Sequence, residues 1–140
     1  MRPQKIAIVT TLWQRDALER IVLRYYSDLQ LDGLELILIA VGSEGRSSLE
    51  RATDNGWHYV EAPNSPLSNK WNYGAMAASN YDPDGLVIIG SDDLLNKSYF
   101  DMIVEEAKTN PGVIQLGDAY FYDVASAEMA YIPRCNPGAG

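Results

Sequence analysis

The sequence has few cysteines and histidines and no long hydrophobic run, and these absences exclude several classes of protein. It contains one cysteine, Cys135, and one histidine, His58. A single cysteine allows no internal disulfide, and because the histidine lies in a different segment we expect no thiol nucleophile with a histidine base. No apolar run approaches the roughly 18 residues of a membrane span, and Met1–Lys5 leads into a strand pattern rather than a signal peptide. We therefore expect a cytoplasmic protein without a transmembrane segment.

Positive charge is also scarce. The chain has 11 Lys and Arg residues against 19 Asp and Glu residues, a formal net charge of −8. Binding to a phosphate backbone depends on surplus Lys and Arg, so this balance argues against a nucleic-acid partner. A small anionic ligand stays compatible with the sequence if a metal ion or a local lysine offsets the negative field.

What the sequence does contain is a regular alternation of strand and helix patterns. Its 140 residues, 46% hydrophobic and 21% charged, suit one soluble domain with a real core, spanning residues 1–140. Buried strands are predicted at 5–11, 35–41, 57–61, 86–89 and 113–116. Helices are predicted at 17–29, 47–54, 69–79 and 97–108, and an antiparallel hairpin at 119–124 and 128–132. This order predicts an α/β fold, a three-layer sandwich around a mostly parallel sheet with a C-terminal hairpin.

The segment Leu86–Leu95 is the most informative part of the chain. The apolar run Leu86–Ile89 predicts a central strand buried on both faces, and it stops at Gly90-Ser91-Asp92-Asp93. Ligands of open parallel sheets bind beyond the carboxyl ends of the strands. Two adjacent carboxylates repel each other unless a cation lies beside them, and a divalent ion with oxygen ligands suits them. The simpler alternative is that both acids cap the helix that starts near Lys97.

Several ligand-binding α/β folds fit the sequence poorly. A dinucleotide-binding fold needs a glycine-rich turn after the first strand, and Thr10–Arg15 contains no glycine. The phosphate-loop pattern is absent as well. A phospho-acceptor receiver domain has a similar length and strand alternation, but its acid pair follows the first strand, where this chain has no acid before Asp16.

Three segments together resemble one known family. Trp13-Gln14-Arg15 follows the first strand, Lys70-Trp71-Asn72-Tyr73-Gly74 lies in the helix before the acidic strand, and Gly90–Asp93 ends that strand. They resemble, in order, the aromatic-Asn-Arg turn, the Asn-x-Gly helix core and the DxD-type acidic motif of glycosyltransferase family 2-like proteins. The resemblance covers nearly the whole chain. It implies a GT-A fold, that of nucleotide-diphospho-sugar transferases, and a metal-dependent glycosyltransferase.

The resemblance also implies a donor site. A nucleotide-diphospho-sugar would be held through Mn²⁺ or Mg²⁺ between its diphosphate and the acid pair. Asp93 would ligate the metal, and Asp92 would either share the metal or accept a hydrogen bond from the ribose. Lys70 would pair with phosphate, and Trp13 would stack on or flank the base. The remaining donor-binding residues would be Thr10, Thr11, Arg15 and Asn72. Simpler roles are a packed aromatic for Trp13, a solvated side chain for Lys70, a backbone bridge for Asn72, pairing of Arg15 with Asp16 or Glu19, and a strand residue for His58.

The sequence departs from the family pattern at three points. Ala40 and Val41 stand where many members carry an aspartate that reads the base, and Gly90 replaces a further aspartate. The family's catalytic base lies in an acceptor-binding region beyond Gly140, so the acceptor portion is expected to be missing or reduced, and the base is unknown. Asp118 and Asp123 are expected to be structural. The acceptor, a saccharide, lipid or protein, stays open. Alternatives are a non-catalytic nucleotide-sugar-binding or assembly module and, less favoured, a receiver-like domain.

Overall fold

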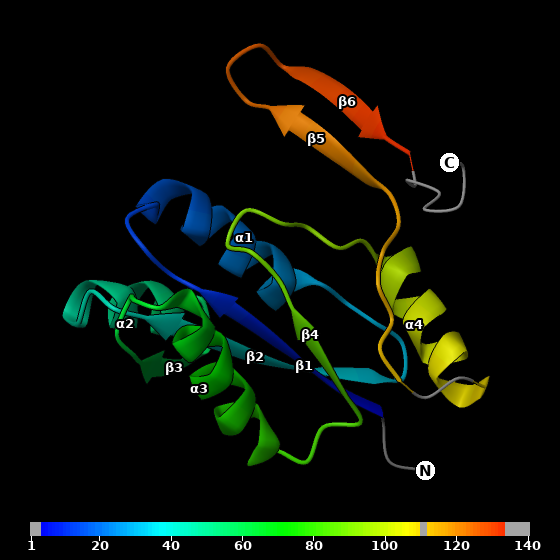
Figure 1. Cartoon of the computed structure of the whole chain (residues 1–140), viewed down its shortest axis with the longest axis horizontal. Helices are drawn as coiled ribbons and strands as arrows, with labels where there is room; N and C mark the ends of the chain where they lie inside the picture. Colours follow the sequence, from blue (N-terminus) through cyan, green and yellow to red (C-terminus); the bar gives the residue numbers. More distant parts are fainter. Residues whose placement is uncertain (1–3, 110–111, 134–140) are drawn as a thin grey trace. The chain divides into compact units, whose positions relative to one another are not determined.

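The computed structural model describes residues 4–109 and 112–133, which fall into two compact units (Figure 1). The sheet unit comprises the described residues up to Lys97, and the hairpin unit comprises the described residues from Ser98 onward. Cys135 and the C-terminal segment from residue 134 lie outside the described residues. All predicted site residues belong to the sheet unit.

The sheet unit alternates strands and helices. Its elements are β1 (Gln4–Thr11), α1 (Asp16–Asp28), β2 (Leu34–Gly42), α2 (Arg46–Asp54), β3 (His58–Glu61), α3 (Leu67–Ser79) and β4 (Gly85–Ile88). The strands form one sheet in the order β3-β2-β1-β4, and every neighbouring pair is parallel. The predicted α/β class with a mostly parallel sheet is therefore confirmed.

Helices cover both faces of this sheet. The chain winds outward from β1 to β2 and β3, and then returns past β1 to form β4. Because parallel crossovers are right-handed, this reversal puts α3 on the opposite face from α1 and α2. Helix α3 packs against β1 and β2 (Figure 1). On the other side, Trp57 Nε1 donates to Leu23 O of α1 at 2.9 Å, which ties the start of β3 to that helix.

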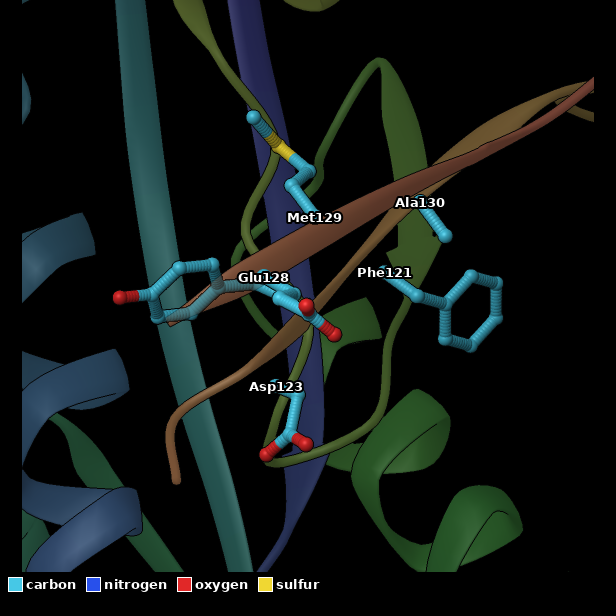
Figure 2. A pocket seen from close by; sticks show the side chains of 6 residues that line it. Phe121, Asp123, Glu128, Met129 and Ala130 are labelled. Carbon is cyan, nitrogen blue, oxygen red and sulfur yellow. The ribbon is translucent and has the colours of Figure 1, made fainter. Parts of the chain in front are cut away.

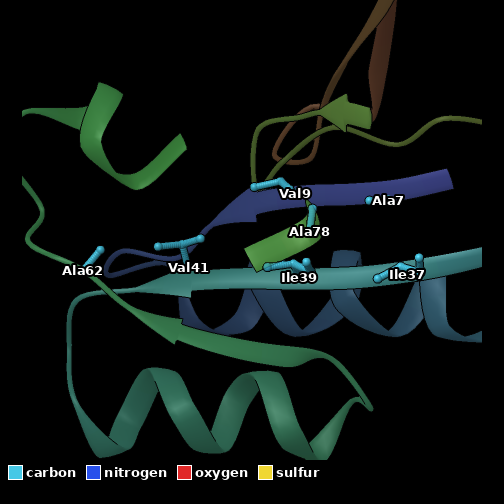
Figure 3. Packing of buried hydrophobic residues seen from close by; sticks show 7 residues of the cluster. All are labelled: Ala7, Val9, Ile37, Ile39, Val41, Ala62 and Ala78. Atoms are coloured by element: carbon cyan, nitrogen blue, oxygen red, sulfur yellow. The ribbon is translucent and has the colours of Figure 1, made fainter. Parts of the chain in front are cut away.

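The core beneath α3 depends on a close approach of helix and sheet. Figure 3 shows the buried side chains of this cluster, which are Ala7, Val9, Ile37, Ile39, Val41, Ala62 and Ala78. A Cβ added to Gly74 of α3 would lie 2.2 Å from Val9 Cγ1 and 3.0 Å from Val41 Cγ2. Only glycine leaves room for this packing. The glycine of the Asn72-Tyr73-Gly74 segment therefore has a packing role.

Two strand predictions are wrong. β4 is an edge strand of the described sheet rather than a central one, and Leu86 and Ile88 are 45% and 51% exposed. Only the alternate residues Val87 and Ile89 are buried, so the continuous apolar run gave a false signal of burial on both faces. Residues 113–116 form no strand. Strand propensity needs a neighbour to accept the ladder hydrogen bonds, and this segment pairs with none in the described part of the chain.

The start of α3 also differs from the prediction. The sequence places a capping side chain at Ser68 or Asn69, but the helix begins at Leu67, with Pro66 as its N-cap and no side-chain cap hydrogen bond. Pro66 follows a cis peptide bond from Ser65. The fixed φ of proline suits a helix start, so the proline-containing loop itself sets the boundary.

The hairpin unit contains most of α4 (Lys97–Thr109) and the antiparallel pair β5 (Ala119–Asp123) and β6 (Glu128–Ile132). The predicted hairpin is confirmed. Asp123 closes its turn by accepting from Ala125 N at 2.9 Å and Ser126 Oγ at 3.0 Å, and Asp118 accepts from Tyr131 Oη at 2.8 Å. These bonds agree with the structural roles predicted for both aspartates.

The two strands of this hairpin line a hollow of about 600 Å³ (Figure 2). Its lining residues are Phe121, Tyr122, Asp123, Glu128, Met129 and Ala130. None of them is a predicted site residue.

No helix in the described ranges is long and apolar enough to cross a membrane.

Candidate functional site

The candidate site lies where the direction of strand succession reverses. In the order β3-β2-β1-β4 this switch falls between β1 and β4. Open α/β sheets bind ligands in the crevice beyond the carboxyl ends of the strands at such a point. Residues 12–15 follow β1 and residues 89–93 follow β4. The fold therefore brings the first and third segments of the family resemblance to the same edge of the sheet.

One ion pair joins these two loops. Arg15 Nη1 donates to Asp92 Oδ2 at 2.8 Å, and the two side chains are 56% and 50% exposed. The sequence left open a pairing of Arg15 with Asp16 or Glu19, but both of those acids pair with Arg51 instead. An exposed pair of this kind contributes roughly 0–1 kcal/mol to stability. Its main effect is on the charge of the site. Arg15, a predicted donor-binding residue, neutralises Asp92, a predicted metal ligand.

The two acids converge on Gly90. Asp93 Oδ2 accepts from Gly90 N at 3.0 Å. A Cβ added to Gly90 would lie 2.8 Å from Asp93 Oδ2 and 2.9 Å from Asp92 Oδ1. Both side chains are exposed. The two carboxylates therefore occupy the space that a side chain at position 90 would need. Any residue larger than glycine there would displace them.

This arrangement suits a divalent cation that is shared with a ligand. Carboxylate oxygens are the hard donors that Mg²⁺ and Mn²⁺ prefer. Asp92 Oδ1, which faces Gly90, is not the oxygen that Arg15 occupies. Among residues 4–109 and 112–133, no three His, Cys, Asp or Glu side chains form a metal-holding group. Two carboxylates completed by phosphate oxygens and water are a common Mg²⁺ arrangement, so the residues fit a shared ion rather than an all-protein metal centre.

Trp13 and Lys70 form a second contact at this edge of the sheet. The Trp13 side chain is 40% exposed, and Lys70 Nζ lies 5.5 Å from its ring centroid, within cation–π distance. Lys70 is fully buried, and its Nζ donates to Leu12 O and Asn64 Oδ1, each at 2.8 Å. Burial lowers the pKa of Lys70, although nearby glutamates oppose the shift. The alternative of a solvated Lys70 is therefore wrong, since its ammonium fixes the loop after β1.

The remaining predicted residues are less well placed for a ligand. Thr10 is fully buried, and within the described structure its Oγ1 has no hydrogen-bond partner. Thr11 ends β1 opposite Val41 of β2 and is partly buried. Asn72 is exposed on α3, and two helical residues from Lys70 correspond to a turn of about 200°. The structure thus gathers Trp13, Arg15, Asp92 and Asp93 at one edge of the sheet. It buries Lys70 in contact with Trp13 and leaves Asn72 on another face of its helix.

A buried ionic cluster next to this site was not predicted. Arg51 of α2 is 2% exposed and Glu19 of α1 is 0% exposed, and Arg51 Nε lies 2.9 Å from Glu19 Oε2. Arg51 also pairs with Glu44 and with Asp16. Burial alone would lower the pKa of Arg51, but the carboxylates together raise it. One sequence signal was available, because Glu19 lies on the helical stripe of Val22, Leu23 and Tyr26, where a charge needs a partner.

Comparisons with known proteins do not supply a family. No protein-family model matches the chain, and no curated protein matches it. The resemblance to glycosyltransferases therefore stays a prediction from three segments of sequence. Function has to be argued from the residues gathered at the switch point.

Proposed function

We propose that this chain is the donor-binding part of a metal-dependent glycosyltransferase of GT-A fold, which binds a nucleotide-diphospho-sugar with Mn²⁺ or Mg²⁺. One observation carries the proposal. Asp92 Oδ1 and Asp93 Oδ2 converge over Gly90 at the carboxyl end of β4, next to the switch point. Two exposed carboxylates at that position are suited to a cation that a phosphate ligand also binds.

The hydrogen bonds of the loop after β1 support the same proposal. Trp13 N donates to Glu19 Oε1 at 2.7 Å, and Gln14 N donates to Glu44 Oε2 at 3.1 Å. These amides are the groups that would contact phosphate in a dinucleotide-binding fold, and here carboxylates already occupy them. An anionic ligand would therefore be drawn to this acidic protein through a cation at Asp92 and Asp93. When bound, that cation would stabilise the leaving nucleoside diphosphate.

The other residues of the site have separate roles in this proposal. The exposed ring of Trp13 provides a surface on which a nucleobase can stack. Arg15 provides a guanidinium that can exchange its bond with Asp92 for a bond with phosphate, an acceptor of the same geometry. We assign no catalytic base, because Asp118 and Asp123 have structural hydrogen bonds within the hairpin unit.

Isothermal titration with UDP-, GDP-, CDP- and dTDP-sugars, each with and without Mn²⁺, tests the proposal. We expect at least one donor to bind in the presence of Mn²⁺ and to lose its affinity in Asp93→Asn. Asp54→Asn is the matched control, since Asp54 is an exposed acid at the end of α2. It should bind as the wild type does. If no donor binds to the wild type under either condition, the proposal is wrong.

A second candidate is a non-catalytic nucleotide-sugar-binding or assembly module of the same fold. The ion pair between Arg15 and Asp92 favours it, because an arginine already neutralises one of the two acids. This candidate predicts donor binding without hydrolysis or transfer of the sugar. Sugar transfer that disappears in Asp93→Ala would exclude it.

A further inference from the structure

The loop after β1 is held by two carboxylates, which accept hydrogen bonds from its backbone amides. Glu19 of α1 accepts from Trp13 N, and Glu44 of the loop after β2 accepts from Gln14 N. Gln14 has a φ of 54°, a left-handed conformation that residues with a Cβ seldom adopt. This loop therefore does not follow from local backbone preference. The hydrogen bonds from Trp13 N and Gln14 N are contacts that can hold this conformation.

Both carboxylates meet at one buried guanidinium. Arg51 Nε lies 2.9 Å from Glu19 Oε2, and Arg51 Nη2 donates to Glu44 Oε2. The Arg51 side chain is 2% exposed, Glu19 is 0% exposed and Glu44 is 20% exposed. The planar fork of arginine can serve several acceptors at once, which an ammonium group cannot do with the same geometry. One residue of α2 thus connects the loop after β1 to the loop after β2.

We infer that Glu19, Glu44 and Arg51 form a clamp that fixes the loop Trp13–Arg15 and so positions Trp13 and Arg15 for the donor. These three are positioning residues, because their part in the proposal is to hold the loop that carries Trp13 and Arg15. The fixed amides of Trp13 and Gln14 immediately precede Arg15, whose guanidinium reaches Asp92 across the switch point. The conformational part of this inference stands by itself. The part about the donor rests on the proposed function.

The clamp depends on charge as well as shape. A hydrogen bond to an ionised carboxylate is roughly twice as strong as one to a neutral acceptor. Without Arg51, Glu19 would be a buried carboxylate without its charge partner, and this cost favours a rearrangement of the side chain. Such a rearrangement would weaken the bond to Trp13 N. Glu44 is the safer position for substitution, because it is partly exposed and glutamine retains an acceptor oxygen.

Fluorine NMR of protein labelled with 5-fluorotryptophan tests the conformational part. Trp13, Trp57 and Trp71 give three resonances, which Trp→Phe variants assign. In Glu44→Gln and Arg51→Lys we expect the Trp13 resonance to shift or broaden, while those of Trp57 and Trp71 stay in place. Glu50→Gln and Arg46→Lys are the matched controls, since these residues form an exposed pair on the same helix. Neither control should change the Trp13 resonance.

Two results would overturn the clamp. A Trp13 resonance that stays unchanged in Glu44→Gln shows that the loop does not depend on it. A joint shift of all three resonances shows that the cluster only stabilises the unit as a whole. The spectrum of Arg51→Lys is interpreted only if that variant folds. The spectrum of Glu44→Gln is by itself enough to show whether the clamp exists. Amide exchange gives a second measure, because the amides of Trp13 and Gln14 should exchange faster while those of Ile8 and Val9 keep their rates.

The donor part has its own measurement. With Mn²⁺ and a donor that binds the wild type, we expect affinity to fall about tenfold in Glu44→Gln and to stay unchanged in Glu50→Gln. A shifted Trp13 resonance with unchanged donor affinity would overturn the positioning role. If no donor binds the wild type, the proposed function fails, whereas the NMR result still decides whether the clamp exists.

Discussion

Tyr26 of α1 holds the acidic loop through Asp93. Its hydroxyl donates to Asp93 O at 3.0 Å and accepts from Leu95 N at 2.9 Å. The Tyr26 side chain is 1% exposed and packs edge-on against Trp57, with 6.1 Å between ring centroids. A core residue therefore fixes the backbone on both sides of Leu94. The position of the Asp93 carboxylate depends on this contact as well as on the turn at Gly90.

Replacing Tyr26 by phenylalanine should loosen the loop without opening the core. The ring keeps its packing, but Asp93 O and Leu95 N lose their shared partner. We expect a loss of about 1 kcal/mol in the free energy of unfolding, measured by urea denaturation, and weaker Mn²⁺ binding. Tyr73→Phe is the control, because Tyr73 is 46% exposed on α3. Equal Mn²⁺ affinity in wild type and Tyr26→Phe would show that the loop keeps its shape without the hydroxyl.

Gly90→Ala tests the convergence of the carboxylates directly. The added Cβ would lie 2.8 Å from Asp93 Oδ2 and 2.9 Å from Asp92 Oδ1, so both side chains must move. We expect Mn²⁺ affinity to fall by about tenfold, measured from the electron paramagnetic resonance signal of free Mn²⁺. Gly112→Ala is a suitable control, since a Cβ there meets nothing within 4 Å. Retained affinity in Gly90→Ala would contradict a shared ion at this position.

Arg15→Gln should act in opposite directions on the metal and on the donor. Removing the guanidinium leaves Asp92 without the positive charge at 2.8 Å, so Mn²⁺ alone should bind a few-fold more tightly at low salt. Binding of the donor with Mn²⁺ should weaken, because a phosphate partner is lost. The same resonance titration and calorimetry measure the two affinities. Arg24→Gln, which removes an exposed arginine of α1, should change neither affinity.

Much of the fold could be predicted from the sequence, because the relevant signals are local. Apolar periodicity predicts α1, α4 and the strands β1, β2 and β3. Turn residues such as Gly33 and Gly56, both of which have positive φ, bound these elements and the short polar helix α2. The edge position of β4 could not be predicted in this way. Strand order is a property of pairing, and a short apolar run reads the same at the edge and in the centre.

The site could be predicted only in part for a related reason. Adjacent acids after a strand are visible in the sequence, so the sequence points to Asp92 and Asp93 as candidates. The pair of Arg15 and Asp92 spans 77 residues, and no local pattern specifies it. Arg51 lies in a short polar helix that gives no sign of burial. Its role depends on acids from α1 and from the loop after β2, which only the folded sheet unit brings together.

Gly74→Ala tests the packing of α3 on the sheet. Alanine favours a helix over glycine by about 1 kcal/mol, so local propensity predicts a more stable protein. The new Cβ would lie 2.2 Å from Val9 Cγ1, and overpacking of a core typically costs about 1–3 kcal/mol. We expect the clash to dominate and the midpoint of urea denaturation to fall. Adding Val9→Ala should recover part of the loss, and a stabilised Gly74→Ala would show that α3 can move away from β1.

The ionised carboxylate of Glu44 should contribute to the free energy of unfolding at neutral pH, and this contribution should be lost at acid pH. Burial works to raise the pKa of this carboxyl, but the hydrogen bond from Gln14 N and the guanidinium of Arg51 together hold it below its ordinary value of 4.5. A carboxyl with a lowered pKa in the folded state contributes stability above its unfolded pKa, and that contribution is lost as pH falls through the folded pKa. Wild type should therefore be more stable than Glu44→Gln at pH 7, and the difference should shrink below about pH 4.5.

Thermal melting of both proteins between about pH 3 and pH 7 measures this difference. Glu50→Gln serves as the control, because Glu50 pairs with Arg46 on the exposed side of α2, and its melting temperature at pH 7 should stay close to that of the wild type. A difference between wild type and Glu44→Gln that stays constant down to pH 3 would mean that glutamine disturbs packing rather than charge. Arg51 would then hold the two loops by shape alone.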